Sequence, residues 1–165
     1  MAGVQVSTSF KWVWSMSAQR IVRQVELSVF IYATEDRAKV IKAVHNMFPK
    51  DSEIPSYSES DLDGYFGDPI ITLQFVEKHR RPASELFNNI IRNLSSLDYL
   101  ILLDELPQRI DETKNLYIRF DKQKALLGKL VLEHHDPVKV KISLMVPHKA
   151  DPAKVLREYM EELRS

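Results

Sequence analysis

The sequence predicts an α+β fold in which a mainly antiparallel sheet carries its helices on one face. Apolar and polar side chains alternate along several short segments, which is typical of strands that are buried on one side. Other segments repeat apolar residues every three or four positions, which indicates amphipathic helices. Hairpin-like pairs of strands dominate and strand–helix–strand units are scarce, so antiparallel pairing is expected.

The first third of the chain predicts a strand, a helix and an edge strand. The strand covers residues 24–34, where alternate aliphatic residues share one face. Residues 35–48 have helical spacing, with the hydroxyl of Thr34 as the expected cap and Pro49 as the residue that stops the helix. The polar stretch at residues 53–63 is expected to pair as an edge strand.

The middle third predicts one strand and two helices. A turn at residues 64–69 contains two glycines and leads into the strand at residues 70–77. The next helix is expected near Pro82, because proline suits a first helical turn. The helix after it begins at Ser96, and Pro107 is expected to end it because proline lacks the N–H that a helix interior needs.

The last third predicts two hairpins. Residues 108–112 and 115–120 are expected to form the first hairpin, and residues 129–135 and 138–146 the second. Residues 121–128 lie between the hairpins and predict one or two helical turns that a glycine closes. An amphipathic helix ends the chain.

Composition limits the class of protein and its compartment. The 165 residues fit one domain, expected at residues 21–165, with residues 1–20 as an N-terminal extension. A second methionine at Met16 leaves open whether the residues before it are a native arm or come from a misplaced start. The absence of cysteine excludes disulfides and cysteine-based zinc sites and fits a cytoplasmic protein. No apolar run has the length of a membrane helix.

Sequence motifs of catalysis and metal binding are missing. The chain has no glycine-rich phosphate loop and no serine nucleophile elbow. His134 and His135 are adjacent, so they would point to opposite sides of a strand and could not share a metal ion. A metal-dependent nuclease that uses Asp61 and Asp63 is the catalytic alternative left open. We therefore expect no enzymatic activity, no metal and no cofactor.

The solvent-facing side of the expected sheet combines aromatic rings with positive charges. The formal net charge is zero, so any surface for nucleic acid must arise from local segregation of charge. Aromatic rings stack on unpaired bases and cations contact phosphates, which makes this face a candidate RNA-binding surface. Half-exposed strands also favour such residues for structural reasons, and rings can dock another subunit. The outward residues are Phe30, Tyr32, Tyr117, Arg119, Lys139 and Lys141.

Two further segments carry positive charge near expected helix starts. Lys122, Gln123 and Lys124 open the short helix, where free backbone N–H groups suit a phosphate. Asp121 before them would serve folding as the cap of that helix. The basic run at residues 78–81 precedes another helix and is equally consistent with an exposed connector.

Three segments resemble a family of small archaeal RNA-binding proteins that are described as predicted exosome subunits. The segments are T-E-D at residues 34–36, G-Y-F-G-D-P-I at residues 64–70 and L-Y-I-R-F-D-K-Q-K-A-L-L-G at residues 116–128. The resemblance extends from about residue 24 to the C-terminus. The chain departs from the family pattern at Asp68, where asparagine is common, and at Lys124, which stands before the alanine that often follows D-K-Q.

The resemblance implies an archaeal cytoplasmic protein with a fold like that of the ribosomal protein that binds 5S ribosomal RNA. It implies that the protein binds RNA and that exosome or ribosomal components are further partners. It also implies an RNA-binding site that consists of Arg119, Asp121, Lys122 and Gln123. The expected function is a non-catalytic RNA-binding accessory of RNA processing or of the ribosome. The alternative is a protein–protein adaptor that docks on such an assembly through its open sheet face, which the neutral net charge favours.

Overall fold

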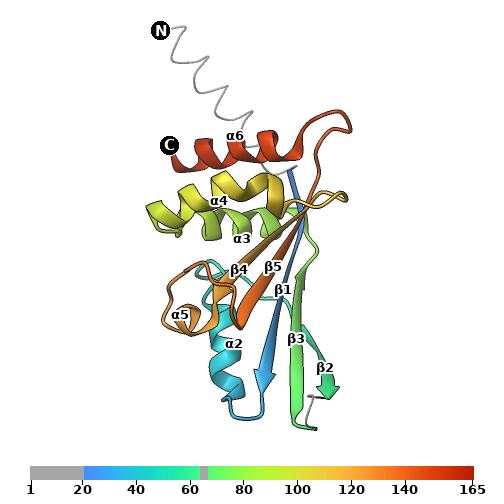
Figure 1. Ribbon diagram of the computed structural model, residues 1–165, viewed down its shortest axis with the longest axis vertical. Coiled ribbons are helices and arrows are strands. Elements are labelled where there is room, and N and C mark those ends of the chain that lie inside the picture. The colour runs from blue at the N-terminus through green and yellow to red at the C-terminus, as the bar shows by residue number, and fades with distance from the viewer. Residues whose placement is uncertain (1–20, 64–66) are drawn as a thin grey trace, which may run out of the picture.

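The computed structural model describes residues 21–63 and 67–165. The expected extension at residues 1–20 and the first half of the expected turn, residues 64–66, lie outside the described residues. The strands are β1 (Val22–Tyr32), β2 (Tyr57–Asp63), β3 (Pro69–Glu77), β4 (Asn115–Asp121) and β5 (Pro137–Leu144). They form one sheet in the spatial order β2-β3-β1-β5-β4, and each neighbouring pair is antiparallel (Figure 1).

The helices cover one face of this sheet. They are α2 (Arg37–His45), α3 (Arg80–Arg92), α4 (Ser96–Arg109), α5 (Lys122–Leu126) and α6 (Pro152–Arg164). α3 packs on β1 and β3, α4 packs on β4, and α6 packs on α3 and α4. α2 and α5 lie against each other beside the other half of the sheet (Figure 1). None of the helices in the described part of the chain is long and apolar enough to cross a membrane.

The alternation along the strands separates a buried face from an open one, as predicted. On the central strand, Val25, Leu27 and Val29 are almost fully buried, while the residues between them are half-exposed. Burial of each such aliphatic side chain stabilises the fold by roughly 1.5–3 kcal/mol. The same pattern holds on β4 and β5, and α3 contributes Phe87 to the common core. The predicted α+β class with an antiparallel sheet and helices on one face is therefore confirmed.

The prediction that Pro107 ends its helix is wrong, because α4 continues through it to Arg109. Proline removes one backbone donor from the ladder. The N–H of Ile110 nevertheless donates to the carbonyl of Leu106 at 3.1 Å, which closes the last turn. The guanidinium of Arg109 also pairs with Glu105, one turn earlier, at 2.6 Å. These contacts outweigh the local stop signal.

In each of the two predicted hairpins, one of the two expected strands is reduced to an isolated bridge. Residues 108–112 contain the end of α4 and a turn, and they pair with β4 at one isolated antiparallel bridge, between Ile110 and Leu116. Residues 129–135 run along the outer edge of β4 and pair with it at one isolated antiparallel bridge, between Leu132 and Phe120, in place of the expected pairing with residues 138–146. The hydrogen bonds of this bridge come from the N–H groups of Asp121 and Glu133, so the N–H of Leu132 points away from β4, and it donates to the carboxylate of Asp98 at 3.1 Å. β4 and β5 pair with each other instead.

Carboxylates cap α2, α5 and α6, in the case of α2 in place of the predicted hydroxyl. The N–H of Ala38 donates to Asp36 Oδ1 at 2.9 Å, so Asp36 caps α2 and the prediction of Thr34 as the cap is wrong. The N–H of Lys124 donates to Asp121 Oδ1 at 2.9 Å, which confirms the predicted cap of α5. A cap of this kind contributes about 1 kcal/mol to helix stability.

Gly128 follows α5 and has a φ of +81°. We expect Gly128→Ala to lower the free energy of unfolding by about 1 kcal/mol, because side chains disfavour this left-handed region. No atom lies within 4 Å of the position that the new Cβ would take, so the loss comes from the backbone alone. Urea denaturation measures it, with Gly128→Asn as a control that should lose less. An alanine variant as stable as the native chain would contradict this expectation.

Candidate nucleic-acid interface

Six of the nine predicted RNA-binding residues lie on the open face of the sheet. They are Phe30 and Tyr32 on β1, Tyr117 and Arg119 on β4, and Lys139 and Lys141 on β5. Each alternates with a buried neighbour, so all six point away from the helices. β5 lies between β1 and β4, which brings distant parts of the sequence together. The predicted orientation is confirmed, and contact with RNA stays a prediction.

Three cations on this face form one block, which we call the cation block: Arg119, Lys139 and Lys141. Arg119 is directly opposite Lys139 in the register of β4 and β5, and Lys141 follows two residues along β5. Such neighbours lie roughly 5 Å apart across strands and roughly 7 Å apart along a strand. Within residues 21–63 and 67–165, none of the three forms an ion pair. Their charges are therefore available to bound phosphates.

Tyr117 is the most accessible of the three rings, with 42% of its surface exposed. Its hydroxyl donates to Asp111 Oδ2 at 2.8 Å. The N–H of Asn115 donates to Asp111 Oδ1 at 2.9 Å, and such hydrogen bonds hold the pKa of Asp111 well below its usual range. The hydrogen bond to Asp111 raises the pKa of Tyr117. The ring is thus held in a fixed orientation as a neutral phenol.

Lysine ammonium groups lie over the other two rings. Lys139 Nζ is 5.1 Å from the ring centroid of Phe30, and Lys122 Nζ is 5.1 Å from that of Tyr32. An exposed cation–π contact such as that of Lys139 with Phe30 is worth about 0.5–1 kcal/mol. The two rings also meet edge to face, with centroids 6.3 Å apart. A base that stacks on Phe30 must therefore share the ring with Lys139, whereas Tyr117 has no such cover among the described residues.

The carboxylate of Glu26 lies beside the cation block, and the sequence interpretation missed it. Glu26 lies opposite Lys141 in the register of β1 and β5. The two side chains form no ion pair, because Gln74 on β3 donates a hydrogen bond from Nε2 to Glu26 Oε1. The alternation that places Phe30 on the open face also places Glu26 there, so the signal was present in the sequence.

Lys122 lies in the interior, with only 3% of its surface exposed. Its ammonium donates to the carbonyl of Phe30 at 3.0 Å and to Glu35 Oε1 at 2.9 Å. It also pairs with Asp136 Oδ2 at 2.9 Å. These three acceptors use all the N–H donors of a lysine, so none is left for a phosphate and the expected direct contact has no free group to make it. The T-E-D and D-K-Q segments of the sequence meet in this ion pair.

Gln123 and Lys124 are exposed, but they lie on α5 beside α2. The side-chain amide of Asn46 donates to the carbonyl of Ala125 at 3.0 Å and ties α5 to the end of α2. Gln123 borders a hollow of about 290 Å³ whose other lining residues come largely from α2 and the residues before it. The structure therefore does not bring these two residues together with the cation block.

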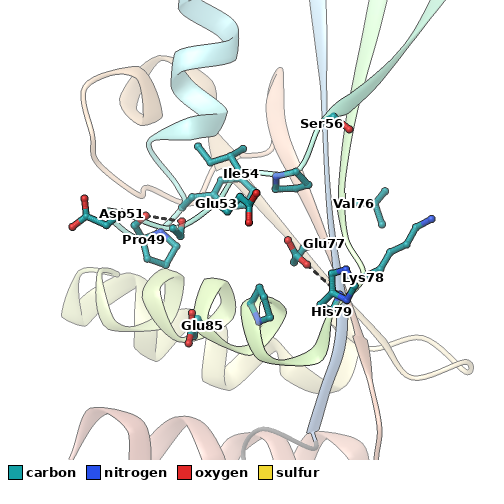
Figure 2. Close-up of a pocket in the computed structure, with 14 residues that line it drawn as sticks. Pro49, Asp51, Glu53, Ile54, Ser56, Val76, Glu77, Lys78, His79 and Glu85 are labelled. Carbon is teal, nitrogen blue, oxygen red and sulfur yellow. Dashed lines mark hydrogen bonds between the residues drawn. The ribbon is translucent and has the colours of Figure 1, made fainter.

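The basic run at residues 78–81 borders an acidic hollow. The hollow has a volume of about 620 Å³ and lies between the chain after α2, the end of β3 and the start of α3 (Figure 2). Glu77 is buried beside it and accepts the N–H of His79 at 3.1 Å, and Arg81 pairs with Glu85 at 3.3 Å. Carboxylates repel phosphates, so this hollow does not suit RNA. Its acidic lining residues are Asp51, Glu53, Glu77 and Glu85.

The alternative of a metal-dependent nuclease needs further metal ligands near Asp61 and Asp63. Asp61 is exposed on the edge strand β2, and the side chain of Asp63 lies outside the described part of the structure. In the part of the chain that the structure describes, no group of three or more histidine, aspartate or glutamate side chains is placed to hold a metal ion.

Comparison with known proteins identifies relatives that share almost the whole chain. RNA-binding protein PAB1135 of Pyrococcus abyssi is 34% identical over 151 residues, which cover 88% of this chain and 98% of that protein. Among solved structures, protein AF2318 of Archaeoglobus fulgidus has a TM-score of 0.71 and 32% identity, and the match covers 86% of this chain and 99% of that chain. Mth689 of Methanothermobacter thermautotrophicus has a TM-score of 0.67 and 29% identity, with 88% and 99% covered.

A family model described as RNA binding matches residues 24–144. The matched residues contain β1 without its first two residues, and they contain all of β2, β3, β4 and β5. The match therefore includes the cation block and the rings beside it. They also contain the buried Lys122 with its two carboxylates. The chain therefore belongs to the RNA binding family.

Proposed function

We propose that this protein binds unpaired RNA on its open sheet face, without catalysis, as an accessory of RNA processing or of the ribosome. Cations of the face contact phosphates, and its rings stack on bases. Membership of the RNA binding family and the name of the Pyrococcus relative support the ligand class. The residues that carry the binding are Arg119, Lys139, Lys141, Tyr117, Tyr32 and Phe30.

The observation that carries this proposal is the cation block beside an accessible ring. The chain has zero net charge, yet three cations meet on one face without an ion pair among the described residues. Tyr117 is directly opposite Lys141 and offers its ring next to them. Single-stranded RNA is bound in this way, because its phosphates meet cations while its unpaired bases stack on aromatic side chains. A duplex hides its base faces, so it would leave the rings unused.

The salt dependence of RNA binding tests the proposal. Fluorescence anisotropy would follow a labelled single strand of about eight nucleotides. Three phosphate contacts predict a slope of about −2 for log Kobs against log salt, so affinity should fall about twentyfold between about 50 and 200 mM salt. A duplex of the same sequence should bind more weakly. A slope near zero would show that the cations do not contact phosphates.

The assembly in which the protein acts is a separate prediction. The family resemblance points to exosome or ribosomal components. Affinity purification of the tagged chain from lysate of its host cells, with and without nuclease treatment, tests this. Components that disappear after nuclease treatment would be held through RNA, as we expect. Partners that survive the treatment would support the alternative of a protein–protein adaptor.

A further inference from the structure

Glu26 places a negative charge beside the cation block on the open face. An acidic residue there weakens the general attraction for RNA, so its position calls for a specific role. From its surroundings we infer that Glu26 recognises guanine in the bound RNA. This inference rests on the proposed function, because it concerns the same open sheet face.

Glu26 and Tyr117 border one hollow of the open face. Glu26 is opposite Lys141 on β5, and Lys141 is opposite Tyr117 on β4, so the three residues form a row across the sheet. The hollow has a volume of about 150 Å³, and its lining includes this row together with Arg119 and Lys139. Two strand spacings separate the ends of the row by roughly 10 Å. A base that stacks on Tyr117 therefore extends toward Glu26, while its phosphates lie near the cations.

Gln74 holds the carboxylate of Glu26 in place. Its amide donates to Glu26 Oε1 from β3, the strand that lies next to β1 on the side opposite β5. Glu26 Oε2 has no hydrogen-bond partner among residues 21–63 and 67–165. Each carboxylate oxygen can accept more than one hydrogen bond, so Oε1 also keeps the capacity for a second. The negative charge of Glu26 also contributes to the raised pKa of Tyr117, after the hydrogen bond to Asp111, burial and the charge of Asp111.

A carboxylate accepts hydrogen bonds and donates none. The Watson–Crick edge of guanine presents two adjacent donors, N1–H and the N2 amino group, which match the two oxygens of Glu26. Adenine and cytosine each place an acceptor next to their amino group, and uracil places acceptors on both sides of N3–H. These acceptors would face the carboxylate and repel it. Guanine is therefore the base that this arrangement favours.

Anisotropy titrations with four oligouridylates test the inference. The strands carry guanine, inosine, adenine or uracil at one central position and are otherwise identical. We expect guanine to bind about tenfold more tightly than adenine, as for a bidentate contact, with inosine between them because it lacks the N2 amino group. In Glu26→Gln the ratio of guanine to adenine affinity should fall to within about twofold, because the new amide presents a donor to the base. The adenine strand should bind this variant more tightly because a negative charge is gone.

Glu158→Gln is the matched control, since Glu158 is an exposed glutamate on α6 and its replacement changes the net charge equally. It should keep the native guanine preference. Equal affinity of the native chain for guanine and adenine would overturn the inference, and so would a guanine preference that survives Glu26→Gln. Either result, with RNA still bound in a salt-dependent way, leaves the proposed function standing. Absence of binding to all four strands would overturn the proposed function and this inference with it.

Discussion

Replacement of Arg119, Lys139 and Lys141 together by glutamine is expected to weaken binding to single-stranded RNA on the order of a hundredfold. The three cations are adjacent on β4 and β5 and have no ion pair among the described residues, so their removal breaks no salt bridge shown there. Each charged hydrogen bond to a phosphate is worth about 1 kcal/mol or more. The slope of log Kobs against log salt should also approach zero, because each neutralised phosphate contributes about 0.7 to its magnitude. Anisotropy titration at several salt concentrations measures both quantities.

A second triple variant distinguishes the contribution of the open face to RNA affinity from the contribution of the chain's net charge. Lys39→Gln, Lys42→Gln and Lys154→Gln remove three exposed lysines from α2 and α6, on the helix side of the sheet. Both triple variants leave 20 of the 23 basic residues and so share a net charge of −3. We expect the helix-side variant to keep most of the native affinity and slope. Equal losses of affinity in both variants would contradict a localised RNA-binding face.

Lys122→Met is expected to lower the free energy of unfolding by about 3 kcal/mol, with little direct effect on RNA binding. The variant leaves the carboxylates of Glu35 and Asp136 without their shared cation, and removal of one partner of a buried ion pair commonly costs about 3–5 kcal/mol. The lower end of this range of free energies applies, because Glu35 keeps 18% and Asp136 keeps 30% of its side-chain surface exposed. Urea denaturation measures the change.

The neighbouring Lys124→Met is the matched control for this variant. Lys124 is exposed and forms no ion pair within the described residues, so its replacement should change stability by less than about 0.5 kcal/mol. Addition of Glu35→Gln and Asp136→Asn to Lys122→Met should recover part of the missing stability, because no buried charge then lacks a partner. If Lys122→Met were as stable as the control but bound RNA weakly, Lys122 would be a phosphate ligand, as its place in the sequence first indicated.

The sequence was most informative where a side chain's environment depends on its nearest neighbours. Alternation along single strands correctly placed Tyr117 and Lys139 on the open face, because orientation in a strand follows from the backbone alone. The same rule identified the buried aliphatic residues of β1. The cap at Asp121 could also be predicted, since it depends on residues that follow at once.

Features that depend on distant partners could not be predicted. Lys122 is buried because Glu35, which is 87 positions away, lies beside it in the fold. Residues 129–135 have the apolar pattern of a strand, but in the fold they meet β4 at one isolated bridge, and Asp98 of α4 accepts the N–H of Leu132 on the side away from β4. Likewise, nothing in the local sequence shows that Gln74 keeps Glu26 from pairing with a lysine on the next strand. Local propensity yields to such tertiary contacts.

The central claim is that RNA lies on the open face of the sheet, opposite the helices. Photo-crosslinking of the full chain to single-stranded RNA that contains 4-thiouridine, followed by mass spectrometry of the attached peptides, tests this most directly. Crosslinks should concentrate on Tyr117, Tyr32 and Phe30, and they should disappear in the triple cation-block variant. Crosslinks that concentrate on α6 or around the acidic hollow at the start of α3, with the open face unlabelled, would contradict the claim.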